Sequence, residues 1–230
     1  MGKDSSVLTT KPLVVGTVHS PESLQFARRL RPGKVDLLEL RVDHFAVDPQ
    51  PLLRAATHFH LPVIVTVRHP AEGGLNALTL GRRRELYGQF LACAAYIDVE
   101  LRSAEALAGI VAAARERGTR VILSAHDFRA TPPAARLQRI VRAAAVGGAD
   151  LVKIATRADT LAELQRLLGL FATKSPRPLS VMAMGRFGKI SRLLFAQAGS
   201  VLSYGYLAAA NASGQWPAVE LKERLAELAA

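Results

Sequence analysis

The sequence predicts an α/β protein, a single-domain (β/α)8 barrel (TIM barrel) covering residues 1–230. Eight short apolar segments alternate with segments of helical pattern along the whole chain. Most of the eight are continuous apolar runs, which are typical of parallel strands covered on both faces. The length of 230 residues is slightly short for such a barrel. A doubly wound open sheet is the alternative, and it is weakened because Val15-Gly16-Thr17-Val18-His19 is not a Gly-rich phosphate loop.

The predicted strands and helix starts follow in chain order. The strands are Leu13–Val18, Val35–Arg41, Pro62–Arg68, Tyr96–Leu101, Arg120–Phe128, Leu151–Ala155, Pro178–Met184 and Val201–Gly205. A capping side chain precedes Pro at three predicted helix starts, Ser20-Pro21, Asp48-Pro49 and Thr131-Pro132. Thr160 and Glu163 have capping-box spacing, Ser103 can cap the Ala-rich helix that ends near Gly118, and Pro217–Ala229 reads as an amphipathic last helix.

The composition narrows the class of protein. Half the residues are hydrophobic, which excludes wholesale disorder. No apolar run is long enough to cross a bilayer, and Met1-Gly2-Lys3-Asp4-Ser5-Ser6 lacks the apolar stretch of a signal peptide. The single cysteine, Cys93, cannot form an internal disulfide and reads as a small core residue. We therefore expect a cytoplasmic protein with no membrane partner.

The formal net charge is +11, which raises the question of a nucleic-acid partner. The arginines fall in small groups on separate predicted helices, and aromatic residues make up only 6% of the chain. A stripe of basic residues interleaved with aromatics is therefore absent from the sequence, and we expect an Arg-rich surface without a nucleic-acid partner. A basic nucleic-acid-binding domain is the rival hypothesis, which salt-sensitive binding to duplex DNA would favour.

Lys153 is the most unusual residue, because it lies in the apolar run Leu151-Val152-Lys153-Ile154-Ala155. A buried ammonium is expensive. An exposed edge strand or a partner carboxylate, with Glu39 as the candidate, would explain it simply. Alternatively, burial favours the neutral amine, a nucleophile that can form a Schiff base with a carbonyl substrate.

Other polar residues cluster at the predicted strand ends, where barrels carry their functional groups. Glu39 and Arg41 share one strand face, either as a salt-bridged pair lining a pocket or as a solvent-facing pair. Arg68 ends the third strand and precedes a loop with Gly73-Gly74, which can close over a ligand or simply be flexible. Asp98 and Glu100 share a face of the fourth strand.

Three later segments complete the candidate site. His126 lies one strand before Lys153 at comparable depth, either as a satisfied core histidine or as an acid/base for imine chemistry. The glycines around Arg186 and the following helix start can cradle an anion, and Arg192 in that helix can grip a carboxylate. The small residues before Gln215 suit a mobile lid. The other histidines form no convincing metal set and read as surface residues, so no metal and no cofactor is expected.

Together these segments resemble type I 3-dehydroquinate dehydratases of the shikimate pathway. The matching stretches are Glu39-Leu-Arg-Val-Asp-His-Phe45, Arg68-x-x-x-Glu72-Gly-Gly74, His126-Asp-Phe-x-x-Thr-Pro132, Lys153-Ile-Ala155, Met184-Gly-x-x-Gly-x-x-Ser-Arg192 and Ser213-Gly-Gln215. Six stretches in the family's order are highly specific, although no single one is.

The resemblance implies a lyase that dehydrates 3-dehydroquinate to 3-dehydroshikimate without metal or organic cofactor. It assigns the Schiff base to Lys153 and the general acid/base to His126. It assigns substrate contacts to Thr17, Glu39, Arg41, Arg68, Arg192 and Gln215, with Arg192 on the substrate carboxylate. Glu72 and Asp98 resemble supporting carboxylates near the histidine, and the resemblance suggests a homodimer. Asn211 stands where many members have serine, so that contact is not carried over. A class I aldolase acting on a sugar phosphate is the nearest rival, since it shares only the lysine.

Overall fold

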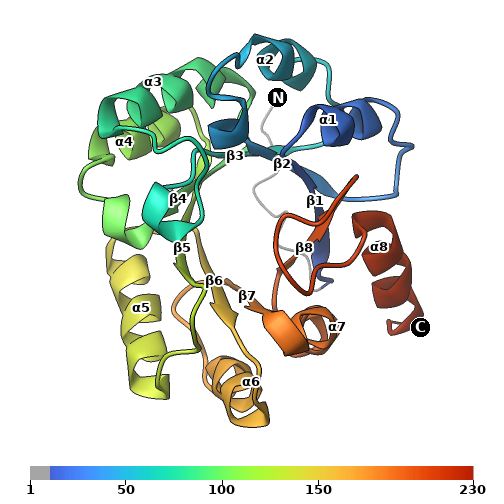
Figure 1. The fold of residues 1–230 in the computed structure, drawn as a ribbon. Coiled ribbons are helices and arrows are strands. Elements are labelled where there is room, and N and C mark those ends of the chain that lie inside the picture. The colour runs from blue at the N-terminus through green and yellow to red at the C-terminus, as the bar shows by residue number, and fades with distance from the viewer. Residues whose placement is uncertain (1–10, 230) are drawn as a thin grey trace.

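Eight parallel strands form a nearly closed barrel in the computed structural model, which describes residues 11–229 (Figure 1). The strands are β1 (Leu13–Val18), β2 (Leu37–Arg41), β3 (Val63–Thr66), β4 (Tyr96–Glu100), β5 (Arg120–Asp127), β6 (Leu151–Arg157), β7 (Leu179–Met184) and β8 (Leu202–Tyr206). The pairing runs from β8 through β1 to β7 in sequence order. The predicted (β/α)8 barrel is confirmed. Each predicted strand corresponds to an observed strand, with ends that differ by zero to two residues.

The barrel closes between β7 and β8 without a regular strand ladder. The backbone N–H of Val201 donates to the carbonyl of Leu179 at 2.8 Å, and the Ser180 hydroxyl donates to the carbonyl of Leu202 at 2.9 Å. A side chain thus supplies one of the bonds that a ladder would supply.

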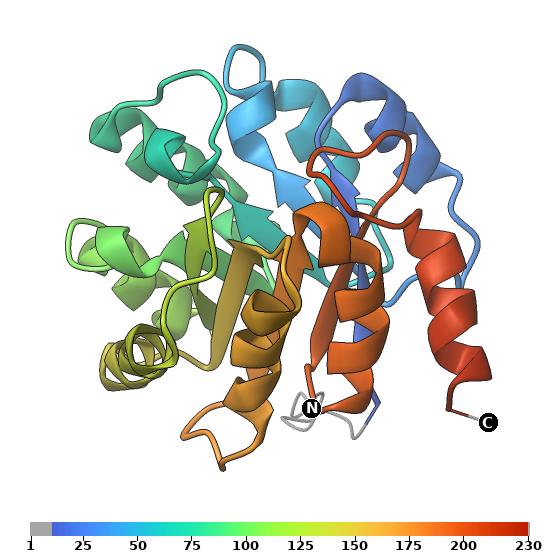
Figure 2. The same ribbon diagram turned by 60° about the horizontal axis from the view of Figure 1, so that its bottom comes forward.

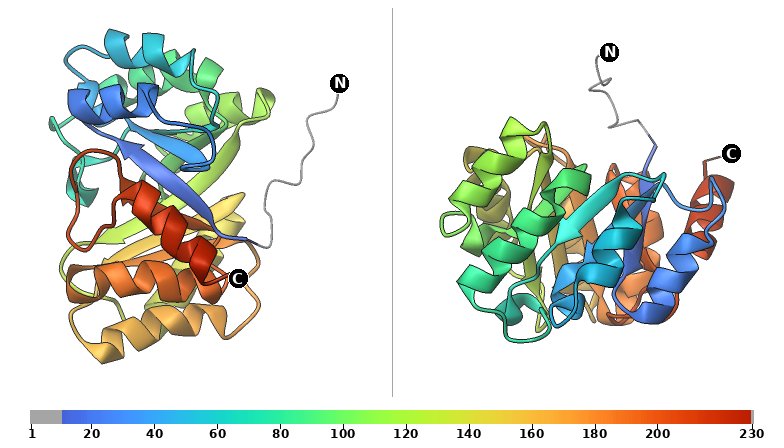
Figure 3. Two further views of the ribbon diagram at one scale, coloured as in Figure 1. Left: turned by 90° about the vertical axis from the view of Figure 1, so that its right-hand side faces the viewer. Right: turned by 90° about the horizontal axis from the view of Figure 1, so that it is seen from above.

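Helices surround the strands on every side (Figures 1 and 3). They are α1 (Pro21–Arg28), α2 (Gln50–Ala56), α3 (Leu80–Phe90), α4 (Ala108–Glu116), α5 (Ala134–Val146), α6 (Leu161–Leu168), α7 (Gly188–Gln197) and α8 (Ala218–Glu227). Short 3-10 turns follow four of the strands described, β2, β3, β4 and β7: they are Val42–Phe45, Pro70–Glu72, Leu101–Ser103 and Gly185–Phe187. Within residues 11–229 no helix has the length and apolar character to span a membrane. Residues 1–6, on which the expectation of no signal peptide rests, lie outside the described residues.

Two of the predicted helix caps are confirmed. Ser20 and Thr160 each accept the backbone N–H three residues on, and both form the reciprocal capping box. Asp48 accepts the N–H of Gln50, but α2 begins after Pro49, one residue later than predicted.

Two other predicted caps are wrong. Thr131 does not cap α5, because its hydroxyl bonds the hydroxyl of Thr156 and the carbonyl of Arg157, and the helix starts at Ala134. Ser103 does not cap α4, because its hydroxyl instead accepts from a buried arginine on α3.

The strands divide the apolar interior into two cores. Outward-facing side chains such as Val14, Leu38 and Val65 pack against the helices. Inward-facing side chains fill the N-terminal end of the barrel: Val15, Leu37, Ile64, Tyr96, Ile122, Leu151 and Leu202.

Two residues further along the strands, the inward positions carry mostly polar side chains, including Glu39, Asp98 and Lys153. Because successive side chains alternate between the two faces of a strand, these groups also point into the barrel. The barrel is thus sealed at one end and polar toward the carboxyl end of its strands, where the loop between β8 and α8 also lies (Figure 2).

Candidate active site

One pocket at the carboxyl end of the barrel gathers every residue to which the resemblance assigned catalysis or substrate contact. Its lining includes Thr17, Glu39, Arg41, Arg68, His126, Lys153, Arg192 and Gln215. Glu72, Phe128, Tyr204 and Asn211 also line it. Residues more than 190 positions apart in the chain therefore meet in one site, as the resemblance implied.

Lys153 is buried, with 4% of its surface exposed. Its Nζ donates to Oδ2 of Asp98 at 2.8 Å and lies 3.5 Å from Oε1 of Glu39. The same nitrogen sits 3.9 Å from the centre of the Tyr204 ring, a cation–π contact. The partner carboxylate that the simple explanation required is therefore present, but Asp98 is the closer partner and Glu39 the second.

Glu39 belongs to the polar layer, the set of inward-facing polar side chains that includes Glu39, Asp98 and Lys153. Its carboxylate accepts from the hydroxyls of Thr17 at 3.1 Å and Thr66 at 3.0 Å. Burial alone would raise the pKa of Glu39, but the charges of Lys153 and Arg41 hold it below its ordinary value. The residue therefore stays an acceptor at neutral pH.

Arg41 does not form the predicted salt bridge with Glu39. Its guanidinium grips Asp43 through Nε at 3.0 Å and Nη2 at 2.8 Å, and Nη2 also reaches the carbonyl of Gly73 at 2.9 Å. Asp43 lies on the 3-10 turn after β2, where both of its oxygens can accept from the guanidinium of Arg41. Glu39, two residues before Arg41 on the strand, does not offer this bidentate geometry. Arg41 still lines the pocket.

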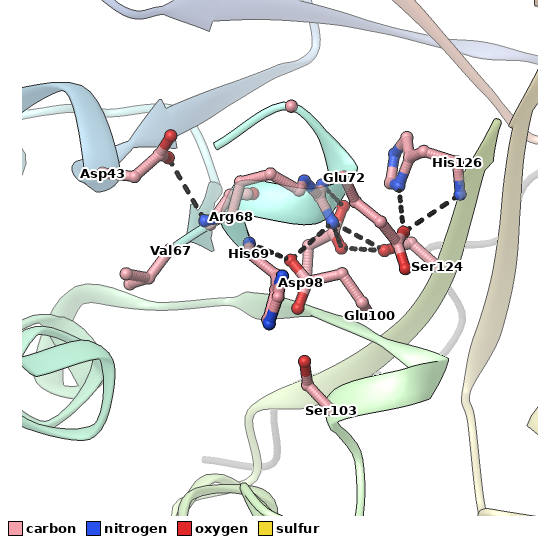
Figure 4. Close-up of polar contacts among 12 residues, drawn as sticks. Asp43, Val67, Arg68, His69, Glu72, Asp98, Glu100, Ser103, Ser124 and His126 are labelled. Carbon is pink, nitrogen blue, oxygen red and sulfur yellow. Dashed lines mark hydrogen bonds and ion pairs between the residues drawn. The ribbon is translucent and has the colours of Figure 1, made fainter. Parts of the chain in front are cut away.

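Arg68 holds two carboxylates together below the pocket (Figure 4). Its guanidinium binds both oxygens of Asp98, at 3.0 and 2.8 Å, and reaches Oε1 of Glu100 at 3.1 Å. It also donates to Oγ of Ser124 at 2.8 Å. Burial opposes ionisation of Asp98, but the charges of Arg68 and Lys153 lower the pKa of Asp98 well below its usual value. Asp98 is thus held as a carboxylate, and the cluster is connected by hydrogen bonds of 2.8 to 3.1 Å.

His126 pairs with Glu72 across the mouth of the barrel (Figure 4). Oε2 of Glu72 lies 2.9 Å from Nδ1 of His126 and accepts its backbone N–H at 3.0 Å. Burial, with the charges of Arg68 and Lys153, lowers the pKa of His126 well below its ordinary value, so the imidazole is neutral. Burial raises the pKa of Glu72 to about 7.

The predicted depth of His126 needs a correction. The register of β5 and β6 pairs Ser124 with Lys153 and His126 with Ala155. His126 therefore lies two residues nearer the pocket mouth than Lys153. Of the two supporting carboxylates, Glu72 contacts the histidine, whereas Asp98 contacts the lysine.

Arg192 is buried on α7, with 2% of its surface exposed. It donates to four backbone carbonyls, those of Tyr204, Ala183, Gly188 and Gly214, at 2.7 to 3.0 Å. Among residues 11–229, no carboxylate pairs with it. Burial lowers the pKa of Arg192 to about 10, so it keeps its charge at neutral pH.

The predicted backbone cradle for an anion before α7 is wrong. The N–H groups of Gly185, Arg186 and Phe187 are bonded to Ser213, Asp159 and Ala158. Near the start of α7, the guanidinium of Arg192 is therefore, among residues 11–229, the group that can meet an anion in the pocket.

The β8–α8 loop is held in place over the pocket by close backbone packing. A Cβ atom on Gly188 would lie 2.6 Å from Cα of Gly214, so both positions require glycine. Gln215 accepts the backbone N–H of Asn211 at 3.0 Å and that of Ala212 at 3.3 Å. Oδ1 of Asn211 is buried without a partner.

Residues 11–229 contain no group of three or more acidic, His or Cys side chains that could hold a metal ion. The surface assignment holds for His58 and His60 but is wrong for His19 and His44. Those two are half-buried and meet edge to face at 5.6 Å, and burial lowers the pKa of each.

Several residues of the polar layer were not identified from the sequence. Thr66, Ser124 and Tyr204 point into the barrel and bond or contact the charged groups. Side chains alternate between the two faces of a strand, so counting every second residue from an inward-facing position of each predicted strand would have identified these three. Arg83 was read as part of an exposed basic run, but it is 1% exposed and binds Glu100. No local pattern distinguishes Arg83 from its exposed neighbour Arg84.

The fold and the pocket define an enzyme of the (β/α)8 class, with a buried lysine and a neutral histidine facing one ligand space. The sequence model of the type I 3-dehydroquinase family matches residues 12–230. The chain belongs to the type I 3-dehydroquinase family, whose members are hydro-lyases.

Curated relatives and solved structures agree. A 3-dehydroquinate dehydratase from Thermococcus gammatolerans is 34% identical over 218 residues, which cover 94% of this chain and 99% of the relative. A type I 3-dehydroquinate dehydratase from Clostridium difficile, solved with covalently modified comenic acid, is 28% identical, with a TM-score of 0.85 over 96% of this chain and 93% of that one. A deoxyribose phosphate aldolase from Aeropyrum pernix is only 18% identical, with a TM-score of 0.61 over 96% of this chain and 92% of that one, and shares the fold alone.

Proposed function

We propose that this protein dehydrates 3-dehydroquinate to 3-dehydroshikimate through a Schiff base on Lys153. The observation that carries the proposal is the placement of Lys153 and His126 in one pocket with Arg192, which has no carboxylate partner among residues 11–229. Relatives named 3-dehydroquinate dehydratase that match over nearly the whole chain support the choice of substrate.

Lys153 is the proposed nucleophile. Its ammonium loses a proton, the amine attacks the C3 ketone of the substrate, and the resulting carbinolamine loses water to give an iminium. The positive charges of Arg41, Arg68 and Arg192 around the pocket favour that proton loss, whereas Asp98 and Glu39 hold the ammonium in the resting site. Water later hydrolyses the iminium and releases the product and the free lysine.

His126 is the proposed acid/base. Because its imidazole is neutral, it can take the C2 proton that the iminium makes acidic. It then returns that proton to the C1 hydroxyl, which leaves as water in a syn elimination. Glu72 accepts from Nδ1–H, which fixes the ring so that Nε2 faces the pocket as the base. The position of His126 nearer the mouth than Lys153 suits contact with carbons next to the imine carbon.

Arg192 is the proposed anchor for the substrate carboxylate. It is a buried cation without a carboxylate partner among the described residues, and it already satisfies four carbonyls. A substrate carboxylate would supply the missing counter-charge.

The remaining predicted residues would bind the hydroxyls of the ring. Thr17, Glu39, Arg41, Arg68 and Gln215 line the pocket, and we propose that they contact the substrate. Asn211, whose buried Oδ1 has no partner, can accept from a substrate hydroxyl. In this scheme the side chains carry every step, with no metal or organic cofactor.

We also propose that the protein is one catalytic domain that acts in the cytoplasm, and the family resemblance suggests that it works as a homodimer. Light scattering during size-exclusion chromatography tests the dimer directly. A monomer at micromolar concentration would contradict it.

The activity is tested by incubating the purified protein with 3-dehydroquinate and following the ultraviolet absorbance of the conjugated enone product. Wild-type protein should form the product, and Lys153→Met, which has similar length and no amine, should not. Absence of product with the wild type overturns the proposal. Turnover of a phosphorylated aldol substrate in place of 3-dehydroquinate would assign the lysine to aldolase chemistry.

A further inference from the structure

Arg83 is a buried arginine on α3 that does not line the pocket. Its exposed fraction is 1%, and it binds Oε2 of Glu100 through Nη2 at 2.5 Å. Nη1 donates to Oγ of Ser103 at 3.1 Å, and Nε donates to the carbonyl of Val67 at 2.9 Å. Such a site fixes the guanidinium in one orientation, with its charge directed at the β4 carboxylate.

From Arg83 a chain of alternating charges leads to the lysine. Glu100 uses Oε1 to accept from Nη1 of Arg68 at 3.1 Å. The same Nη1 donates to Oδ1 of Asp98 at 3.0 Å, and Oδ2 of Asp98 accepts from Nζ of Lys153 at 2.8 Å. Five acidic and basic side chains are therefore connected in the order Arg83, Glu100, Arg68, Asp98, Lys153, and each is at most 4% exposed.

We propose that Arg83 is a positioning residue for the reaction, which acts through Glu100 and Arg68 to set how firmly Asp98 holds the Lys153 ammonium. The inference rests on the proposed function, because it concerns the pH at which the lysine becomes a nucleophile.

Competition for one nitrogen of Arg68 makes the coupling directional. Asp98 and Glu100 both accept from Nη1. While Arg83 neutralises Glu100, Arg68 is free to bind both oxygens of Asp98. Without the charge of Arg83, Glu100 draws Arg68 toward itself. Asp98 is then left with more negative charge for Lys153, and the ammonium is held more firmly.

The other charged and titratable groups around the chain are few and identifiable. Glu39 and Arg41 from β2, His126 from β5 and Tyr204 from β8 face Lys153. Around Glu100 lie Glu72 and His69 from the loop after β3 and Tyr87 from α3. The substitutions below leave these side chains in place. Because the charge of Glu100 contributes to the raised pKa of Glu72, the same cycle is also run in the Glu72→Gln background, where a remaining shift reports on the chain to Lys153.

The test is a cycle of four proteins, each assayed for kcat and KM with 3-dehydroquinate across pH. In Arg83→Met the acid limb of the kcat/KM profile should move to higher pH by about 0.5 to 1 unit, a loss of about 3- to 10-fold below the limb. Glu100→Gln should move it to lower pH. Because Arg83 acts through the Glu100 carboxylate, the double variant should have the profile of Glu100→Gln, and KM at the plateau should stay unchanged because Arg83 does not touch the pocket. Arg83→Lys, which keeps the charge, should restore the wild-type profile.

Shifts in the same direction, or profiles that superpose on that of the wild type, overturn the inference. If Arg83→Met does not fold, Glu100→Gln and the double variant form a pair that differs only at Arg83. Their limbs should coincide, both below the wild-type limb, and a double variant with the higher limb overturns the inference. A wild-type protein without turnover overturns the proposed function itself, before any variant is compared.

Discussion

Glu72 should make the stability of the fold depend on pH in a direction opposite to that of most carboxylates. Glu72 is 8% exposed, and its Oε2 accepts the backbone N–H of His126 and lies 2.9 Å from Nδ1 of the same residue. Burial raises the pKa of Glu72 from 4.5 to about 7. We therefore expect Glu72→Gln, which keeps the shape and the acceptor oxygen, to remove a charge that the fold accommodates poorly.

The sign and size follow from proton linkage. Between pH 4.5 and 7 the folded state binds the Glu72 proton and the unfolded state does not, so stability falls as pH rises through this window. Below pH 4.5 the group contributes nothing, because both states are protonated. At about 1.4 kcal/mol for each pH unit, the ionised carboxylate costs about 3 kcal/mol above pH 7.

The assay is urea unfolding of wild type and Glu72→Gln at pH 4.5 and pH 8. The difference in unfolding free energy should be near zero at pH 4.5 and favour the variant by up to about 3 kcal/mol at pH 8. Glu105→Gln, on the exposed surface, is the matched control and should show no such change. A difference between wild type and Glu72→Gln that is the same at both pH values would refute the reasoning. Activity should fall in the variant, because the histidine loses the carboxylate that orients it.

Three further predictions concern the same pocket. Burial and the charges of Arg68 and Lys153 lower the pKa of His126, so its ring carbon shifts in NMR spectra should titrate well below pH 6.5; a midpoint near 6.5 would contradict this. Arg192→Met should raise KM for 3-dehydroquinate roughly 10- to 100-fold through loss of a charged hydrogen bond, and an unchanged KM would exclude its role as the carboxylate anchor. Gly188→Ala should lower stability by about 1–3 kcal/mol and weaken substrate binding, since the new Cβ meets Gly214 at 2.6 Å; wild-type stability would show that the loop moves aside freely.

Much of the fold could be predicted because each strand is a continuous apolar run bounded by turn or capping residues. Burial on both faces of a parallel strand demands such runs, and eight of them leave few architectures. Helix starts were harder to predict. Ser20 caps its helix as its neighbours suggest, whereas Thr131 turns away to bond β6, since a tertiary partner replaces the local one.

The members of the pocket could be predicted, but not their partners. Lys153 and His126 stand out in the sequence as polar residues in apolar strands, and Arg192 stands out as part of a motif. The choice of Asp98 over Glu39 by the lysine, and of Asp43 over Glu39 by Arg41, depends on strand stagger and on a 3-10 turn. The choice of partner depends on distances across the barrel, and the spacing of residues along the chain does not predict those distances.

The most direct test of the account is reduction of the reaction with borohydride. Wild-type protein incubated with 3-dehydroquinate and borohydride should lose activity, and peptide mapping should locate one ligand-derived adduct on Lys153. Lys153→Met, with its fold verified by circular dichroism, should carry no adduct and form no enone product. Sustained turnover without an adduct, or an adduct on another lysine, would contradict the assignment of Lys153 as the nucleophile.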